Sequence, residues 1–368
     1  MRINPFQAVY PNFDYVASTD TFFSTVKAEY AGYRKSGFFH KTSQEGLYIY
    51  QISTSKRSFI GLVTATDIRD YNDGKIKKHE NTLTSKEQQQ LNLLISRKAM
   101  VKPVLLTYPG VKSINKIINT YVKKNKPFYR CNIAGQKETH KIWEITDGAI
   151  IRDIQNLFKK EVPKSYIADG HHRTSTSALL YDRMKKKGNK KYDQLLAVYF
   201  PINELEVHDY NRVVEGLEDC TLTMFMVRIG QIFDIEILSE AARPENKHEI
   251  TLFVNREWYK LTWKKSVLKE YQKKKVLLDA NMLDEKVLRD ILGITDVRTD
   301  TRITYVEGPK GLDAIRAQVI KNRYRIGFCL HPVDLKDLMK IADSGKTMPP
   351  KSTWFEPRVK NGMIILEP

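Results

Sequence analysis

The residues best suited to chemistry lie together in the run Asp169-Gly-His-His-Arg173. Apolar residues at 166–168 predict a short buried strand before this run. Gly170 then permits a tight turn, because glycine adopts positive φ without a steric penalty. The apolar spacing after the turn predicts a helix that ends near Gly188, which follows a basic run. The expected local structure is therefore a strand, a turn and a helix.

A helix that starts directly after such a turn leaves backbone N–H groups pointing at one spot, where an anion is favoured. His171, His172 and Arg173 surround that spot with side chains that can carry positive charge. Thr174 begins a run of four hydroxyl residues. The combination predicts a phosphate site. The alternative is an ordinary loop and helix cap, in which the polar side chains have only a local role.

A second polar pair, His79 and Glu80, precedes a helix that is predicted to start with a capping box at Thr84. The pair resembles the start of the HExxH zinc motif. Leu83 stands where that motif has its second histidine, so the zinc motif is rejected. The alternative for His79 and Glu80 is a salt-bridged pair in a loop.

Further candidates lie in the second half of the chain. Lys351, Ser352 and Thr353 follow two prolines, whose rigidity would present one lysine and two hydroxyl groups. The alternative for this segment is a polar loop pinned by the aromatic residues after it. Arg212 follows the predicted strand at 194–200 and is a candidate to return to the same cleft. Otherwise it is an exposed polar residue.

The composition limits the class of protein. The chain has 368 residues, of which 41% are hydrophobic, and this length suits two or three domains. No apolar run reaches the roughly 18 residues that a membrane helix needs. Cys131, Cys220 and Cys329 form no CxxC pair. They are predicted to be buried free thiols in a reducing cytoplasm.

The formal net charge of +18 is typical of proteins that bind nucleic acid or another polyanion. The basic residues, however, are spread along the chain in short clusters. No helix-turn-helix and no basic arm is recognisable in the sequence. The pattern favours a solvated surface over a dedicated nucleic-acid face.

Helix and strand signals alternate along the chain and predict an α+β protein, with mixed sheets and helices. We expect a core domain at 1–218 and a smaller α+β domain at 219–368, where signals for antiparallel strands begin. The predicted strands are 3–10, 46–52, 59–64, 104–108, 139–146, 166–168, 194–200, 235–238, 249–254, 258–263, 303–306, 325–330 and 363–366. The predicted helices, besides those after Thr84 and after the turn, are 19–33, 111–122, 148–160, 225–233, 284–292, 311–319 and 335–342.

The run Ile167-Ala-Asp-Gly-His-His-Arg173 resembles the signature of the family called domain of unknown function 1015. The chain departs from that family's pattern at Phe13-Asp-Tyr15, where a Tyr-Asp dipeptide is usual, and at Asp209-Tyr-Asn-Arg212, where Thr-His-Arg is usual. For this chain the resemblance therefore implies neither an acceptor contact at the first of these places nor a further histidine at the second. The other segments that resemble the family, in its order, are Pro5-Phe6, 74–82 with Lys86, the strand ending in Trp143 with Asp147, and 348–355.

The Asp-Gly-His-His-Arg turn is in its turn similar to the phosphate-binding turn of the ParB/sulfiredoxin-like superfamily. That superfamily includes a free-serine kinase, chromosome-partition proteins that hydrolyse nucleotides, and the ATP-using sulfiredoxins. The resemblance implies a ParB-like core at 1–218 and nucleotide-linked phosphoryl chemistry, with ATP or ADP as nucleotide and Mg²⁺ beside it. Analogy between folds does not name the acceptor.

The first hypothesis is therefore a cytoplasmic, nucleotide-dependent phosphotransferase of the kinase type that acts on a small hydroxyl compound. Such chemistry depends on positioning and charge neutralisation. Gly170 and the N–H groups after it would cradle the phosphate, and Arg173 would pair with it through two hydrogen bonds. Asp169 would hold Mg²⁺ or orient a histidine, and His171 and His172 would donate hydrogen bonds to the moving phosphoryl group. Glu80 would be the general base, with His79 beside it. The remaining predicted phosphate ligands are Thr174, Arg212, Lys351, Ser352 and Thr353.

Two alternatives stay open. One is a nucleotide- or nucleic-acid-binding regulator without turnover, which the charge of +18 supports. The other is a metal site on Asp169, His79, His171 and His172. Adjacent histidines in a turn point in different directions and one metal rarely takes both, so the metal site is the least favoured alternative and no metal ligand is assigned.

Overall fold

The structure is a computed structural model of residues 1–368 and describes all of them except 17, 82–83 and 189–191. The side chains at 84–86 and 134 also lie outside the description. The chain divides into a first unit, Met1–Glu206 with Pro357–Pro368, and a second unit, Val207–Glu356. Both units contain helices and sheets, so the predicted α+β class is confirmed.

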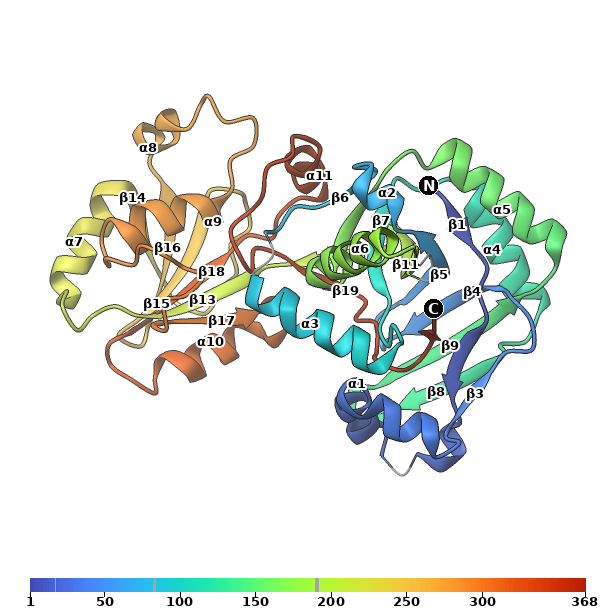
Figure 1. Ribbon diagram of the computed structural model, residues 1–368. Helices are drawn as coiled ribbons and strands as arrows, with labels where there is room; N and C mark the ends of the chain where they lie inside the picture. The colour runs from blue at the N-terminus through green and yellow to red at the C-terminus, as the bar shows by residue number, and fades with distance from the viewer. Residues whose placement is uncertain (17, 82–83, 189–191) are drawn as a thin grey trace. The chain divides into compact units, whose positions relative to one another are not determined.

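The main sheet of the first unit has the order β6-β10-β7-β11-β5-β4-β9-β8, with β1 beside β5 (Figure 1). It is a mixed sheet, because β10 runs parallel to β6 and β11 runs parallel to β7, whereas the other pairs are antiparallel. The strands are β1 (Ile3–Asn4), β4 (Leu47–Ser53), β5 (Ser58–Asp67), β6 (Ile76–Lys77), β7 (Val104–Tyr108), β8 (Tyr129–Ile133), β9 (Glu138–Ile145), β10 (Ser165–Asp169) and β11 (Gln194–Pro201).

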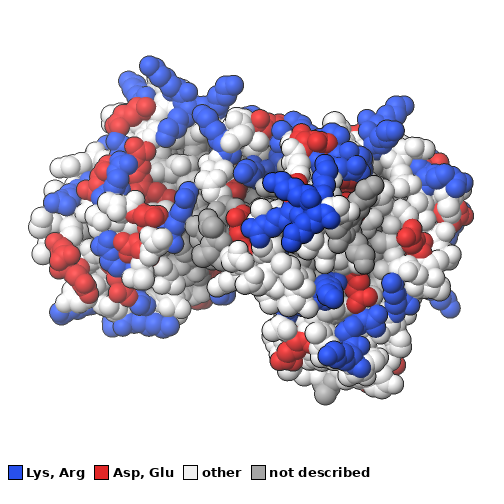
Figure 2. All heavy atoms as spheres, viewed as in Figure 1, with Lys and Arg blue, Asp and Glu red and all other residues white. Residues whose placement is uncertain are grey.

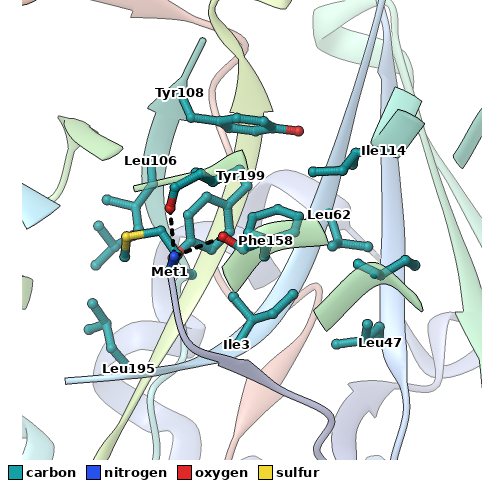
Figure 3. Close-up of a cluster of buried hydrophobic side chains, with 14 of the residues drawn as sticks. Met1, Ile3, Leu47, Leu62, Leu106, Tyr108, Ile114, Phe158, Leu195 and Tyr199 are labelled. Atoms are coloured by element: carbon teal, nitrogen blue, oxygen red, sulfur yellow. Dashed lines mark hydrogen bonds between the residues drawn. The ribbon is translucent and has the colours of Figure 1, made fainter. Parts of the chain in front are cut away.

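One face of this sheet is covered by α4 (Lys112–Lys124) and α5 (Gly148–Glu161), whose apolar residues join a single core cluster with the sheet. Figure 3 shows part of this cluster, including Leu62, Phe158 and Tyr199. The amino group of Met1 donates to the carbonyl oxygens of Phe158 at 2.9 Å and Val162 at 2.5 Å. The core is therefore formed where the apolar faces of these two helices pack against the sheet, as the spacing of their apolar residues predicts.

The other helices of the first unit are α1 (Thr19–Lys35), α2 (Arg69–Asn72), α3 (Thr84–Arg97) and α6 (His171–Lys186), and α3 packs against α6. Ser18 caps α1 by accepting from the backbone N–H of Thr21. The capping box predicted at Thr84 falls on the stretch whose side chains are outside the description. Single 3₁₀ turns lie at Phe13–Tyr15, Ala134–Gln136 and Ile202–Glu204.

A small sheet of the first unit joins the two ends of the sequence. Its order is β20 (Ile365–Leu366), β2 (Ala8–Pro11) and β3 (Phe39–Lys41). The strand predicted at 3–10 is therefore divided between β1 and β2, which belong to different sheets. Pro5 lies at the break, and proline cannot donate to a strand ladder. The C-terminal segment is thus an integral part of the first unit.

The second unit is built on an antiparallel sheet with the order β14-β16-β15-β18-β13-β17. One face carries α7, α9 and a π-helix at Leu283–Arg289, and the other carries α10. The strands of this sheet are β13 (Tyr210–Glu215), β14 (Phe233–Leu238), β15 (Glu249–Val254), β16 (Glu257–Trp263), β17 (Ile303–Glu307) and β18 (Arg325–Leu330). A separate two-stranded sheet pairs β12 (Glu206–His208) with β19 (Trp354–Glu356). The helices are α7 (Leu222–Ile232), α8 (Lys265–Glu270), α9 (Asp279–Met282), α10 (Gly311–Val319) and α11 (Leu335–Asp343), with a 3₁₀ turn at Gly308–Lys310.

The division between the units differs from the boundary expected after residue 218. The segment 207–218 belongs to the second unit, and 357–368 returns to the first. The three cysteines are free and buried, as predicted. Among the described residues, no helix combines the length and the apolar character that crossing a membrane requires.

Candidate functional site

The turn between β10 and α6 has the predicted form. Gly170 precedes the helix with φ of 111°, a value that side chains disfavour. A Cβ atom at this position would lie 2.9 Å from Nη2 of Arg173, so the side chain of Arg173 closes over the glycine. The pairing of β10 with β7 shifts register between Ile167 and Asp169, so the ladder is irregular at the end of the strand where Asp169 lies.

Three cationic side chains surround the carboxylate of Asp169. Nη2 of Arg173 lies 2.6 Å from its Oδ2, and Nζ of Lys102 lies 3.4 Å from the same oxygen. Nη1 of Arg358 lies 3.6 Å from Oδ1. One carboxylate therefore faces three positive groups. The group carries a net charge of about +2 when all are ionised, at the end of a helix that itself favours anions.

The charges alter the protonation of the site. Burial alone would raise the pKa of Asp169, but the positive charges of Arg173, Lys102 and Arg358 outweigh it and hold that pKa well below its usual range. Burial lowers the pKa of Lys102 to about 8, although the charge of Asp169 opposes the shift. Asp169 is therefore an anion, and Lys102 changes its charge slightly above neutral pH.

Arg173 also fixes the turn to the rest of the first unit. Its Nη1 donates to the carbonyl oxygens of Lys102 at 3.1 Å and Pro103 at 2.5 Å. Its Nη2 donates to Asp169. These hydrogen bonds hold the first turn of α6 against the segment before β7, so the arginine positions the site as well as charging it.

The His79-Glu80 segment reaches the turn through His171. Nδ1 of His171 lies 3.6 Å from Oε2 of Glu80, and the rings of His79 and His171 have centroids 4.4 Å apart. The backbone N–H of His79 donates to Nε2 of His171 at 3.4 Å. That contact assigns the proton of the neutral ring to Nδ1, on the side of Glu80.

The two histidines are buried and uncharged. Burial lowers the pKa of His171 to about 3. Burial, together with the neighbouring His171, also lowers the pKa of His79 well below its usual range. A buried neutral imidazole can donate one hydrogen bond but does not supply a positive charge.

The hydroxyl groups of the turn are largely used within the fold. Oγ1 of Thr174 donates to the carbonyl of Gly170 at 3.1 Å, and the residue is fully buried. Ser175 donates to a carboxylate oxygen of Glu87 at 2.6 Å, which joins α6 to α3. His172 is only partly buried. The backbone of the turn is therefore better suited to an anion than the hydroxyl of Thr174.

The remaining predicted ligands belong to the second unit. Arg212 is fully buried, its Nε lies 3.3 Å from Oδ1 of Asp284, and its guanidinium faces the ring of Tyr305. The three loop residues differ among themselves. Ser352 is buried and donates to the carbonyl of Pro349, Lys351 is exposed with φ of 54°, and Thr353 is partly buried.

The two cations that sequence reasoning missed are Lys102 and Arg358. Lys102 lies between Val101 and Pro103 directly before a buried strand, and a lysine among such neighbours is the signal that was available. Arg358 has no comparable local signal. It follows the loop of Lys351 to Thr353 by five residues, but its contact with Asp169 depends on the return of the C-terminal segment.

The model of a family described as "Protein of unknown function (DUF1015)" matches residues 9–286 of this chain. No protein in the curated set matches the sequence.

Several solved structures resemble the fold weakly. A C-terminally truncated SbnI from Staphylococcus aureus has a TM-score of 0.41 at 12% identity, over 81% of this chain and 85% of its own. A free serine kinase in complex with AMP has 0.39 at 13%, over 80% and 86%. A conserved hypothetical protein from Pyrococcus furiosus has 0.37 at 13%, over 80% and 90%. At such TM-scores the likeness supports no conclusion about ligands.

Proposed function

We propose that this chain, which belongs to the DUF1015 family, is a nucleotide-dependent phosphotransferase that holds the transferred phosphate at the turn between β10 and α6. The observation that carries the proposal is the cluster of three cations around Asp169 at a helix N-terminus. An incoming phosphate would meet the net positive charge of this cluster and the N–H groups of the first helical turn.

Glu80 is the proposed general base for the acceptor. The oxygen of a small hydroxyl compound would attack the terminal phosphorus of ATP or ADP. A new O–P bond forms, the P–O bond to the remaining nucleotide breaks, and the hydroxyl proton passes to the carboxylate of Glu80. His171, with its proton on the side of Glu80, orients that carboxylate.

The cation cluster also bears on Mg²⁺. Asp169 does not fit a magnesium ligand, because three positive side chains already face its two oxygens and would repel a divalent ion. No step is therefore assigned to Mg²⁺ at this residue. Lys351, Ser352 and Thr353 remain phosphate ligands predicted from the sequence, whereas Arg212 is fully buried beside Asp284 and is not assigned to the phosphate.

The test is a thermal-shift and calorimetric series with ATP, ADP and pyrophosphate on the native chain and on Arg173→Lys and Arg173→Ala. A ligand at a hundred times its Kd stabilises a fold by about 2.7 kcal/mol. We expect binding by the native chain, weaker binding by the lysine variant and none by the alanine variant. Unchanged affinity in a folded Arg173→Ala protein would contradict the phosphate site.

Turnover separates this proposal from a binding regulator. Phosphoryl transfer from a bound nucleotide to any of a panel of small alcohols supports the enzyme. Tight nucleotide or DNA binding without transfer to any of them would favour the regulator. Figure 2 shows lysine and arginine side chains on both units of the visible face, interspersed with aspartate and glutamate. A mixed surface of this kind gives the regulator no added support.

A further inference from the structure

Strand β14 lies at one edge of the sheet in the second unit. The sheet order begins β14-β16, so in the part of the chain that the structure describes only β16 pairs with β14. All six residue pairs of this ladder follow one register without a bulge, and the strand contains no proline. Sheet edges that are protected against pairing are commonly short, bulged or interrupted by proline. The side of β14 that faces away from β16, called the open edge below, can therefore accept a further strand.

The backbone groups of two residues point towards the open edge. The N–H of Lys264 donates to the carbonyl of Ile232 at 3.1 Å, which makes these residues a hydrogen-bonded pair at the start of the ladder. Hydrogen-bonded and non-hydrogen-bonded pairs alternate along an antiparallel ladder. The residues two and four positions further along β14 therefore bond to β16. The N–H and carbonyl groups of Ile235 and Ile237 face the open edge instead.

The side chains of β14 alternate between apolar and acidic. Ile235 and Ile237 are 37% and 65% exposed, although they share a face of the sheet with the buried Phe233, which packs in the core beneath α7. Asp234 and Glu236 are exposed on the opposite face. The strand therefore presents an apolar pair of side chains on one face and an acidic pair on the other.

The apolar surface continues onto α7, which leads directly into β14 (Figure 1). A Cβ atom at Gly230 of this helix would lie 3.9 Å from Cδ1 of Ile235, so the two elements touch there. Val227, one helical turn before Gly230, is 61% exposed, and Met224, a further turn away, is 47% exposed. Exposed apolar side chains that gather in this way commonly mark an interaction surface.

The acidic side chains decide which strand fits the open edge. No ion pair involves Asp234 or Glu236 among the described residues, and Lys260, which lies opposite Glu236 on β16, has its Nζ 3.2 Å from Glu249. Two copies of β14 paired antiparallel about a twofold axis would place Glu236 against itself or against Asp234. Like charges directly opposite each other are destabilising. The edge therefore disfavours a second copy of this chain and favours a strand with basic residues.

We propose that the open edge of β14 is a docking site for an extended segment of a partner protein in which apolar and basic residues alternate. The segment adds a strand to the sheet by hydrogen bonds to the backbone of Ile235 and Ile237. Its apolar side chains cover those two isoleucines and Val227, and its lysine or arginine side chains face Asp234 and Glu236. The docking site is independent of the proposed phosphate site, because all of these residues belong to the second unit.

The experiment is a fluorescence anisotropy titration of the full chain into a labelled synthetic peptide in which valine and lysine alternate. The formal net charge of +18 repels this peptide, so general electrostatics oppose the binding that we expect. One control peptide has the same composition with valines and lysines in separate blocks. Another is alternating but carries N-methyl groups on the nitrogens that face β14. Both should bind much more weakly, and equal binding of either would overturn strand addition.

Variants of β14 test the charge and the backbone separately. The double variant Asp234→Lys with Glu236→Lys should bind the valine-lysine peptide at least about fivefold more weakly, since two opposite-charge pairs become like-charge pairs. It should gain binding of an alternating valine-glutamate peptide. Ile235→Pro removes the N–H that faces the open edge but no donor of the ladder to β16, so it should lose the peptide and keep a near-native melting temperature.

The matched control is Asp153→Lys with Asp313→Lys, the same charge change at exposed carboxylates on α5 and α10. It should bind the peptide with native affinity, and a loss equal to that of the β14 double variant would overturn the proposal. A dimer of the native chain that Ile235→Pro abolishes would assign the edge to a second copy and overturn it as well. Failure of the native chain to bind the peptide would overturn the docking site and leave the phosphate site standing.

Discussion

The imidazole of His171 joins the two polar motifs of the first unit, with Nδ1 3.6 Å from Oε2 of Glu80 and Nε2 accepting from the backbone N–H of His79. The two segments are far apart in sequence, yet a single side chain contacts both. The ring stays neutral because burial lowers its pKa to about 3. The ring therefore orients the carboxylate of Glu80 and holds a proton on its side, and it adds no positive charge to the site.

Replacing Glu80 with glutamine tests the role of that carboxylate. We expect Glu80→Gln to bind nucleotide with native affinity and to lose transfer activity by roughly 10²- to 10⁴-fold, the range for loss of a general base. Calorimetry and a transfer assay on the same preparation measure both quantities. Glu87→Gln, on α3, is the control for loss of a nearby carboxylate. Near-native turnover in Glu80→Gln would remove Glu80 from the base role.

Raising the pH tests Lys102. Because the pKa of Lys102 is about 8, its positive charge is present below that pH and disappears as pH rises through it. A bound anion favours the charged form, so affinity for pyrophosphate should fall as pH increases from about 8 towards the ordinary lysine range. Lys102→Arg should keep tight pyrophosphate binding to higher pH. Lys102→Gln should bind pyrophosphate weakly, and its affinity should not change over this pH range. A native pH profile in Lys102→Gln would contradict this assignment.

Replacing Gly170 with alanine tests the backbone of the turn. The positive φ alone costs roughly 1–2 kcal/mol for a side chain. The new Cβ also meets Arg173 at 2.9 Å, which should displace the guanidinium and weaken anion binding. Gly188→Ala is the matched control, since Gly188 has φ of 73° and an added Cβ would meet none of the described residues within 4 Å. Both variants should lower the free energy of unfolding, but only Gly170→Ala should lose affinity.

Acidification tests the buried histidines. The folded-state pKa of His171 is about 3, below the ordinary histidine value of 6.5, so the neutral ring contributes stability above pH 6.5 and loses it progressively as pH falls. One such histidine gives a slope of at most about 1.4 kcal/mol per pH unit. Urea denaturation between pH 7.5 and 4.5 measures it. His171→Gln should have a shallower slope, and an unchanged slope would show that the ring is not buried neutral.

The local part of the site follows from the sequence because its causes are local. Strand β10, the turn at Gly170 and helix α6 depend on neighbouring residues, and the structure has them where the apolar pattern predicts. Thr174 shows the limit of that reasoning. A hydroxyl at a helix start can bind an anion or donate to the carbonyl of the preceding turn, and Thr174 donates to the carbonyl of Gly170.

The long-range contacts of the site could not be predicted from the sequence in this way. Lys102 and Arg358 reach Asp169 only because β7 pairs with β10 and the C-terminal segment returns to the first unit. No periodicity in a single sequence encodes such pairings. The boundary expected after residue 218 describes two successive domains, whereas residues 357–368 group with the first unit, and the sequence carries no local signal for that return.

The return of the C-terminal segment has a consequence for synthesis. The ribosome makes residues 207–356 before it makes Arg358 and β20, although both belong to the first unit. Until then, Asp169 lacks one of its three cations and β2 lacks its partner β20. A nascent chain stalled before residue 357 would therefore carry an unfinished first unit, and its anion site would be completed only after Arg358 has been made.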